Sequence, residues 1–375
     1  MYGLTVFNSG RGPERFRRGA AIAVAAERAG FDAVWTGELY NRSATIPMAN
    51  LAAATERVRI GSNIAYGVGR SPLVWAAEAR DLDELSGGRI VLGLGNGTPA
   101  MMRNWHSVSG ESPAARMEEL VEVLRKLWRL HEGPVDHDGL FYTVHLRPTA
   151  ETPPPIQERL PIWTAGVNPK MIRVAGKVSD GLVGHPMFTP DYLDAVVRPE
   201  LAAGASAAGR DPSEITLMGI LMCADDDDED QARRRLAYAI AQYAPSKVYA
   251  RIFAALGGPE VQQRILDAIR ERDDDAMIAA VPDPVIDAIG VACTPADLAK
   301  RVEAHAVGYD HLNLAAPVWG LSPEEAEAAT LAILDNALPG GAATSSGSES
   351  RRQLREDPDG LPAGEHAATG PDGGR

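Results

Sequence analysis

The sequence predicts a (β/α)8 TIM barrel with insertions, and two features of its pattern favour that fold. Short apolar runs with β-type residues alternate with longer runs at helical spacing, which is typical of βα units on a parallel sheet. About eight such units occur before residue 338. An open doubly wound sheet rarely contains so many, whereas closing eight parallel strands into a barrel removes both sheet edges.

The predicted strands follow one another with room for a helix after each. In the first unit, a strand at residues 2–7 precedes a helical run at residues 16–29, which Gly30 ends. Further strands are predicted at residues 33–35, 58–65, 90–94, 160–164, 181–183, 216–223 and 311–315. Residues 129–158 and about 245–292 exceed a minimal barrel, and we interpret both as insertions that shape the barrel mouth.

The composition is that of an acidic globular protein. The 375 residues carry 37 Lys and Arg against 51 Asp and Glu, a formal net charge of −14. Such a surface repels nucleic-acid phosphates and anionic lipids, so neither is an expected partner. The sequence has no run of the ~20 apolar residues that a membrane span needs and no recognisable secretory signal. With only Cys223 and Cys293, and no CxxC pair, we expect a reducing, cytoplasmic location.

Residues 339–375 differ in composition from the rest of the chain. They contain almost no large apolar side chains, so they cannot bury enough surface to offset the entropy cost of ordering. They carry four Arg and six acidic residues, so nearly all of the negative charge belongs to the remainder. We predict a barrel domain at residues 1–338 and a disordered C-terminal tail at residues 339–375.

Several kinds of catalytic site have no motif in this sequence. The eight His residues form no HExxH and no other metal-ligand spacing, so no metal site is predicted. No GxSxG nucleophile elbow or GxxxxGK[ST] phosphate loop occurs, and residues 93–97 read GLGNG rather than GxGxxG. The small residues at the predicted strand ends instead suit a barrel in which a large cofactor carries the chemistry.

Two predicted strand ends carry residues suited to a flat ligand. Near the end of the third strand, Asn63 and Ile64 interrupt the apolar run at the expected mouth, although Asn is also an ordinary turn residue. Around the fourth strand, Gly93, Gly95 and Gly97 remove side chains and let a planar ligand approach the backbone. Tight packing inside the barrel is the alternative explanation for these glycines.

A third strand end has the features of an anion site. The fifth predicted strand is followed by the small residues Ala165 and Gly166, and Pro169 then opens a helix. Free N–H groups and the positive end of the helix dipole are therefore expected at the mouth. Gly184 and His185 end the next strand beside them. A purely structural helix cap is the alternative.

The chain resembles the bacterial-luciferase-like flavin and deazaflavin oxidoreductases. Within that superfamily it most resembles methylenetetrahydromethanopterin reductase, which uses the deazaflavin coenzyme F420. The matching segments are AERAGFDAVWTGELYNR, ATERVRIGSNIAYGVGRSP, DELSGGRIVLGLGNG, LPIWTAGVNPKMIRVAGKVSDG and ACTPADLAKRVEAHAVGYDHLNLAAP, which follow in order through residues 2–338.

The resemblance implies a set of cofactor-binding residues. Asn63 and Ile64 would be joined by a non-prolyl cis peptide that backs the deazaflavin ring, and Gly95, Asn96 and Gly97 would lie along the ring and the ribityl chain. The residues implied to hold the phosphate are Ala165, Gly166, Val167, Gly184 and His185.

Glu38, in WTGELYN, is the candidate catalytic residue. It matches a family acid near the pyrimidine edge of the coenzyme or the substrate, and an acid merely hydrogen-bonded at a strand end is the alternative. Leu39 stands where relatives commonly have His, so proton transfer by a His is not expected there. Thr98 stands where the sugar-phosphate dehydrogenases of the group carry an acid, so that activity is not expected.

The implied reaction is a reversible hydride transfer between coenzyme F420 and a small organic substrate, with a methylene-pterin as one candidate. The protein would stack the two reactants and exclude water. Lys170, Arg173 and Lys177 are candidates to meet the anionic coenzyme, or are ordinary surface charges. The alternatives are an FMN-dependent monooxygenase that uses molecular oxygen and a flavin-binding protein without catalysis. The resemblance also implies a homodimer that pairs through the early helices.

Overall fold

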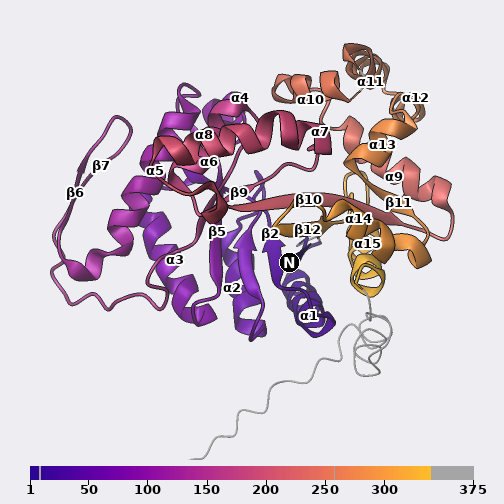
Figure 1. Ribbon diagram of the computed structural model, residues 1–375. Helices are drawn as coiled ribbons and strands as arrows, with labels where there is room; N and C mark the ends of the chain where they lie inside the picture. Colours follow the sequence, from indigo (N-terminus) through magenta and orange to yellow (C-terminus); the bar gives the residue numbers. More distant parts are fainter. Residues whose placement is uncertain (8–9, 257, 339–375) are drawn as a thin grey trace, which may run out of the picture.

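Eight parallel strands close into a barrel in the computed structural model, which describes residues 1–7, 10–256 and 258–338 (Figure 1). Around the barrel the strands follow the order β1, β2, β3, β5, β8, β9, β10 and β12, and β12 pairs back with β1. The (β/α)8 barrel predicted from the sequence is therefore confirmed. The predicted tail at residues 339–375 lies outside the described residues.

All eight predicted strands are present, close to their expected positions. The barrel strands are β1 (Tyr2–Thr5), β2 (Ala33–Thr36), β3 (Arg59–Ser62), β5 (Ile90–Gly95), β8 (Ile162–Ala165), β9 (Gly181–Val183), β10 (Thr216–Asp225) and β12 (His311–Ala315). Two short strands extend the sheet. β4 (Ala65–Tyr66) pairs with the end of β5, and β11 (Gly290–Cys293), which the sequence analysis missed, pairs with the last four residues of β10.

Helices cover the outside of the barrel (Figure 1). The helices that follow the barrel strands are α1 (Glu14–Ala29), α2 (Thr45–Ala54), α3 (Pro72–Ser86), α5 (Pro113–Trp128), α6 (Pro169–Val178), α8 (Arg198–Ala207), α9 (Glu229–Ala241) and α15 (Pro323–Asn336), and α14 (Leu298–His305) follows β11. Two shorter helices, α4 (Pro99–His106) and α7 (Pro190–Tyr192), lie in loops. In the described part of the chain, none of the helices is both long enough and apolar enough to cross a membrane.

The two predicted insertions lie on opposite sides of the molecule. The first contains an antiparallel hairpin of β6 (Val135–Asp138) and β7 (Thr143–Leu146), which stands away from the barrel (Figure 1). The second contains a single helical turn η5 (Lys247–Tyr249) followed by α10 (Ala250–Ala255), α11 (Pro259–Glu271), α12 (Asp274–Ala279) and α13 (Asp283–Ile289). Helices α10–α12 rise above the carboxyl ends of the strands in Figure 1.

Two tryptophans and one histidine fill the barrel interior. The rings of Trp35 and Trp163 are buried with centroids 5.2 Å apart, and Trp35 Nε1 donates to Nε2 of buried His311 over 3.0 Å. A Cβ atom on Gly3 would lie 2.6 Å from the Trp35 ring, and one on Gly181 would lie 2.8 Å from the Trp163 ring. Glycines that face inward therefore provide the space that the two large rings occupy.

We expect the barrel to lose stability as the pH falls from about 6.5 to about 4. Burial, helped by the N-terminal amino group, lowers the pKa of His311 to about 4. As the pH falls, the unfolded chain therefore binds a proton at His311 near pH 6.5, whereas the folded chain binds it only near pH 4. The free energy of unfolding should fall by about 3 kcal/mol between these two pH values. His311→Gln removes this titration and retains an acceptor for Trp35, so the free energy of urea unfolding should fall less steeply across this pH range than in wild type.

His305→Gln, at a partly exposed histidine on α14, is the matched control and should leave the pH profile unchanged. Burial also lowers the pKa of His185, to about 3, so some dependence of the same sign should remain in His311→Gln. A wild-type unfolding free energy that stays constant over this pH range would contradict the expectation.

Candidate active site

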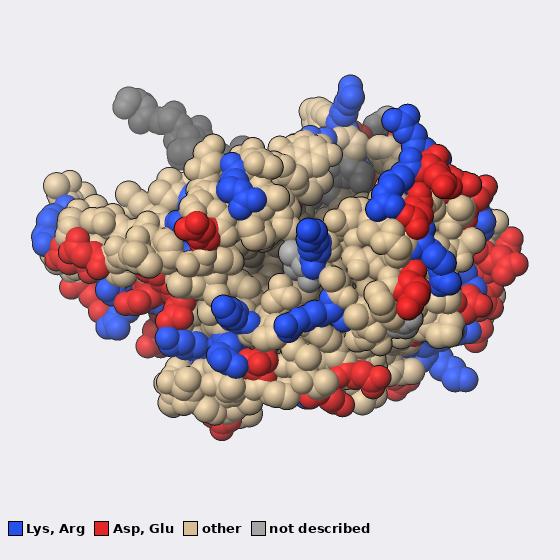
Figure 2. Space-filling view, turned by 90° about the horizontal axis from the view of Figure 1, so that it is seen from above, with Lys and Arg blue, Asp and Glu red and all other residues tan. Residues whose placement is uncertain are grey.

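A pocket of about 510 Å³ lies at the carboxyl ends of the barrel strands. In the view from above, a hollow is visible near the middle of this face, with Lys and Arg side chains around it (Figure 2). All ten residues that the resemblance assigned to the cofactor line this pocket: Asn63, Ile64, Gly95, Asn96, Gly97, Ala165, Gly166, Val167, Gly184 and His185. The fold thus brings together four strand ends that are far apart in the sequence.

One wall of the pocket comes from the ends of β3 and β5. The Asn63–Ile64 peptide bond is cis, as the resemblance implies. Gly97 has a positive φ of 68°, a conformation that glycine adopts without strain. Gly93 does not line the pocket, and a Cβ atom there would collide with the Ser62 carbonyl oxygen, so tight packing explains this glycine.

The wall also carries an unpaired polar atom. Asn96 is buried, and its Nδ2 donates to the Pro113 carbonyl oxygen over 2.7 Å, while its Oδ1 has no hydrogen-bond partner among the described residues. Buried acceptors are seldom left unpaired, because an unmade hydrogen bond costs about 1–3 kcal/mol. Asn96 Oδ1 is therefore suited to a hydroxyl or N–H group of a ligand in the pocket.

The turn between β8 and α6, where an anion site is predicted, presents backbone N–H groups ahead of a helix. In the part of the chain that the structure describes, the backbone N–H groups of Gly166, Val167 and Asn168 donate to no protein acceptor. They precede the ten-residue helix α6, whose N-terminus carries a partial positive charge. The turn itself is held in place, since the Tyr192 hydroxyl donates to the Val167 carbonyl oxygen over 2.9 Å.

His185 adds a neutral ring beside this turn. Burial lowers its pKa to about 3, and its Nδ1 accepts the backbone N–H of Met187 over 3.2 Å, so the neutral ring carries its proton on Nε2. None of the three candidate cations, Lys170, Arg173 and Lys177, lines the pocket. Lys177 pairs with Glu118 and Arg173 pairs with Glu200 on the surface, and Lys170 is exposed.

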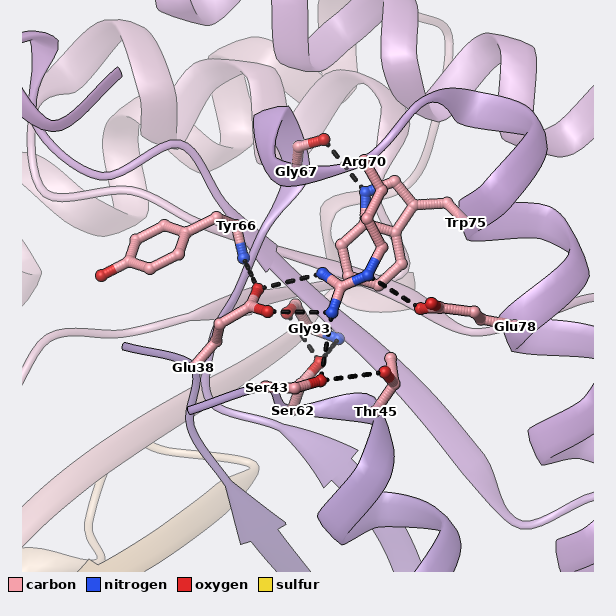
Figure 3. A network of polar contacts seen from close by, with 10 residues as sticks. All are labelled: Glu38, Ser43, Thr45, Ser62, Tyr66, Gly67, Arg70, Trp75, Glu78 and Gly93. Carbon is pink, nitrogen blue, oxygen red and sulfur yellow. Dashed lines mark hydrogen bonds and ion pairs between the residues drawn. The ribbon is translucent and has the colours of Figure 1, made fainter. Parts of the chain in front are cut away.

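Glu38 lies outside the residues that line the pocket and is held in a network of polar contacts (Figure 3). Its carboxylate accepts from Arg70 Nη2 at 2.9 Å and Nη1 at 3.2 Å, and from the Tyr66 backbone N–H at 2.8 Å. The two charged side chains are only 11% and 15% exposed. Burial lowers the pKa of Arg70, but its contacts with Glu38 and Glu78 outweigh this effect and raise it overall. Both carboxylate oxygens of Glu38 are thus engaged.

This network holds residues 64–66, which follow β3 at the pocket wall. The Glu38 backbone N–H donates to the Ile64 carbonyl oxygen over 2.9 Å, while its side chain holds Tyr66. Arg70 also lies 4.4 Å from the ring of Trp75, whose Nε1 donates to Gly67. Figure 3 shows the Tyr66 ring pointing away from this network. The geometry therefore favours the alternative that Glu38 is an acid hydrogen-bonded at a strand end.

Comparison with known proteins identifies the family. The family model described as luciferase-like monooxygenase matches residues 3–311. The chain belongs to this family. Its relatives include an uncharacterized protein of Mycobacterium tuberculosis, 31% identical over 285 residues that cover 74% of this chain and 84% of the relative. The 5,10-methylenetetrahydromethanopterin reductase of Methanolobus tindarius is 29% identical over 306 residues, covering 80% of this chain and 90% of the enzyme.

A solved structure gives the same result for the fold. The coenzyme F420 dependent tetrahydromethanopterin reductase of Methanopyrus kandleri matches with a TM-score of 0.69 and 23% identity, covering 88% of this chain and 96% of that one. Taken with the family match, these relatives make this luciferase-like protein an oxidoreductase with a flavin or deazaflavin cofactor. The alternative of a flavin-binding protein without catalysis is therefore not retained.

The sequence analysis missed the residues that complete the pocket of this luciferase-like barrel. Tyr66 follows Ile64 by two positions in the quoted segment IAYG, so strand alternation could have found it. Tyr243, Tyr249 and Trp319 also line the pocket but come from a helix end, the second insertion and a loop. No motif marks them. No group of three or more His, Cys, Asp or Glu within the described residues is arranged to hold a metal ion.

We expect Glu38→Gln to reduce thermal stability and cofactor affinity together. The amide retains the size of the side chain but removes the charge that Arg70 faces, which should cost about 1–3 kcal/mol of unfolding free energy. Thermal unfolding and a fluorescence titration with the cofactor measure the two effects.

Glu78→Gln is the control, because Glu78 contacts Arg70 Nε at 2.9 Å but does not bond to the segment at the pocket wall. It should lower stability less and leave cofactor affinity unchanged. Normal folding and binding in Glu38→Gln with complete loss of turnover would instead identify Glu38 as a catalytic residue.

Gly166→Ala should weaken cofactor binding by at least about tenfold. A Cβ atom at this position would lie 2.9 Å from the Ile172 nitrogen, so the turn must shift and its N–H groups must move. Losing one or two charge-assisted hydrogen bonds to a phosphate accounts for a change of this size. Equilibrium titration with the cofactor measures it.

Gly209→Ala is the control, because Gly209 has a positive φ of 68° and open space around it at the surface. This substitution should lower stability only. Equal affinities of Gly166→Ala and wild type would contradict the proposed phosphate site.

Proposed function

We propose that this protein is an F420-dependent oxidoreductase that transfers a hydride between the deazaflavin and a small organic substrate. The observation that carries the proposal is the pocket, which all ten of the implied cofactor residues line. Two relatives named as reductases, one of which is described as coenzyme F420 dependent, support the same chemistry.

The residues present fit a deazaflavin with a phosphate side chain. Gly95 and Gly97 leave the wall open to a flat ring, and the unpaired Oδ1 of Asn96 suits a ring N–H or a ribityl hydroxyl. The free N–H groups of residues 166–168 suit the phosphate. When bound and reduced, the deazaflavin supplies a hydride, and the protein positions the acceptor and excludes water.

The charges in and around the pocket favour hydride transfer over chemistry that needs a carboxylate or an ammonium group at the reacting atoms. No Asp, Glu, Lys or Arg is among the described residues that line it. The nearby carboxylate of Glu38 is occupied by Arg70. Transfer of a hydride between stacked reactants needs close approach and a dry environment more than it needs an ionised side chain. An FMN-dependent monooxygenase is the second candidate, because the family description names a monooxygenase.

Titration of the purified protein with coenzyme F420 and, separately, with FMN tests the proposal. We expect F420 to bind with a Kd in the micromolar range or below and FMN to bind at least about tenfold more weakly. The absorbance of the deazaflavin and the fluorescence of both cofactors report binding without requiring a substrate. Tight binding of FMN with no binding of F420 would overturn the proposal and favour the monooxygenase.

A further inference from the structure

The wall across the barrel from the proposed cofactor wall is apolar and aromatic. β10 and β12 stand opposite β3 and β5 in the barrel order, and they contribute Ile220, Met222 and Ala315 to the pocket. Above them lie Tyr243 after α9, Tyr249 in η5 and Trp319 after β12. A molecule that stacks on the cofactor therefore faces hydrocarbon and aromatic rings.

Four rings on this side form one cluster, which we call the aromatic cluster: His185, Tyr243, Tyr249 and Trp319. The Tyr243 ring lies 4.8 Å from Trp319, 5.2 Å from Tyr249 and 4.9 Å from His185, and His185 lies 4.6 Å from Tyr249. These separations are those of packed aromatic pairs. The cluster joins three loops and the second insertion, so its phenol groups are held in place by packing.

Two hydroxyl groups of the cluster have no protein partner. Among the described residues, neither the Tyr243 nor the Tyr249 hydroxyl makes a hydrogen bond, whereas that of nearby Tyr192 donates to Val167. The hydroxyl of a largely buried tyrosine usually finds a partner. Since both residues line the pocket, their hydroxyl groups are available to a ligand there.

The titratable groups in the pocket are all neutral near pH 7. Burial raises the pKa of Tyr66 to about 12, raises those of Tyr243 and Tyr249, and lowers that of His185 to about 3. The Tyr66 ring packs 5.0 Å from His106 and near Gly97, on the cofactor side. A cationic or anionic substrate group would therefore enter the pocket without a counter-charge, at a large desolvation cost.

We propose that the substrate is a neutral carbonyl compound with an apolar body, and that the Tyr243 and Tyr249 hydroxyl groups donate hydrogen bonds to its oxygen. This inference rests on the proposed function, because it needs a hydride donor at the opposite wall. In the reductive direction the carbonyl carbon gains a hydride, which carries two electrons, the C=O π pair moves to oxygen, and the oxygen takes a proton from a tyrosine hydroxyl. The tyrosinate recovers its proton from water, so a ketone, a hydride and one proton give a secondary alcohol.

A methylene-pterin fits this pocket less well. Hydride transfer to an iminium carbon requires a cationic acceptor, and no carboxylate lines the pocket among the described residues to balance that charge. The carbon of a carbonyl substrate is uncharged before transfer, and the negative charge that develops on its oxygen would be met by the two O–H groups.

Binding of four six-membered-ring probes to the F420-loaded protein tests the inference by calorimetry. Cyclohexanone should bind more tightly than methylenecyclohexane, which has the same shape without the oxygen, and both should exceed cyclohexanecarboxylate and cyclohexylammonium. Tyr243→Phe and Tyr249→Phe should each weaken cyclohexanone binding about 5- to 10-fold and leave methylenecyclohexane and F420 binding unchanged. Oxidation of cyclohexanol, followed by the loss of deazaflavin absorbance, should slow in the same variants.

Tyr309→Phe is the matched control, since Tyr309 is a partly buried tyrosine that packs near Gly219 outside the pocket. It should change none of these affinities. Retained F420 binding with no preference for cyclohexanone, or with affinities unaffected in both pocket variants, would overturn this inference and leave the proposed function standing. Failure of the wild-type protein to bind F420 would overturn the proposed function, and with it the hydride donor that this inference needs.

Discussion

The interior of this barrel is filled at one end and left open at the other, and the site depends on that difference. Eight strands enclose only enough room for side chains to fill the centre. The Trp35 and Trp163 rings fill the part of the barrel away from the pocket. Gly3, Gly61 and Gly181 leave space for them, because a Cβ atom at any of these positions would collide with one of the two rings. At the carboxyl ends the same strands finish in small residues such as Gly95, Ala165 and Ala315, so the pocket needs no wider barrel. The hydrogen bond from Trp35 to His311 holds the Trp35 ring in place within the filled part of the barrel.

The protein combines an acidic composition with a pocket that no Asp, Glu, Lys or Arg among the described residues lines. Charged side chains are placed outside the pocket, where water solvates them, and the buried pair beside the pocket is internally neutralised. Arg70 is shared between Glu38 and Glu78 and stacks on Trp75, so its charge is satisfied without any contact with a ligand. A buried pair of this kind adds little net stability but fixes geometry, because separating the partners would leave a charge uncompensated. The proposed anion site can then rely on backbone N–H groups.

The strands could be predicted because their signals are local, and the resemblance pointed to the residues that line one wall of the pocket. Apolar runs, glycines and a proline at a helix start depend on neighbouring residues, and all ten of the residues proposed to bind the cofactor lie at or just beyond the ends of strands that the pattern identified. The role of Glu38 could not be predicted, since Arg70 lies 32 residues away and only the fold brings them together. The positions of Tyr243 and Tyr249 in the pocket could not be predicted for the same reason, since only the fold brings them to it. The segment DELSGGR shows the difference well: the sequence offered it as a family signature, whereas the structure explains Arg89, which donates to the carbonyl oxygens of Ala52, Thr55 and Val58 near the end of α2.

His185 connects the two walls of the pocket. It follows β9 beside the turn whose N–H groups face the pocket, and its ring packs on Tyr249 and Tyr243. Because its Nδ1 is occupied by the Met187 N–H, the orientation of the ring is set by the backbone rather than by a ligand. The aromatic cluster is thus positioned by the same strand end that borders the anion turn. A rigid contact of this kind lowers the entropy lost when two reactants are held in register, which is the main contribution a protein makes to a hydride transfer.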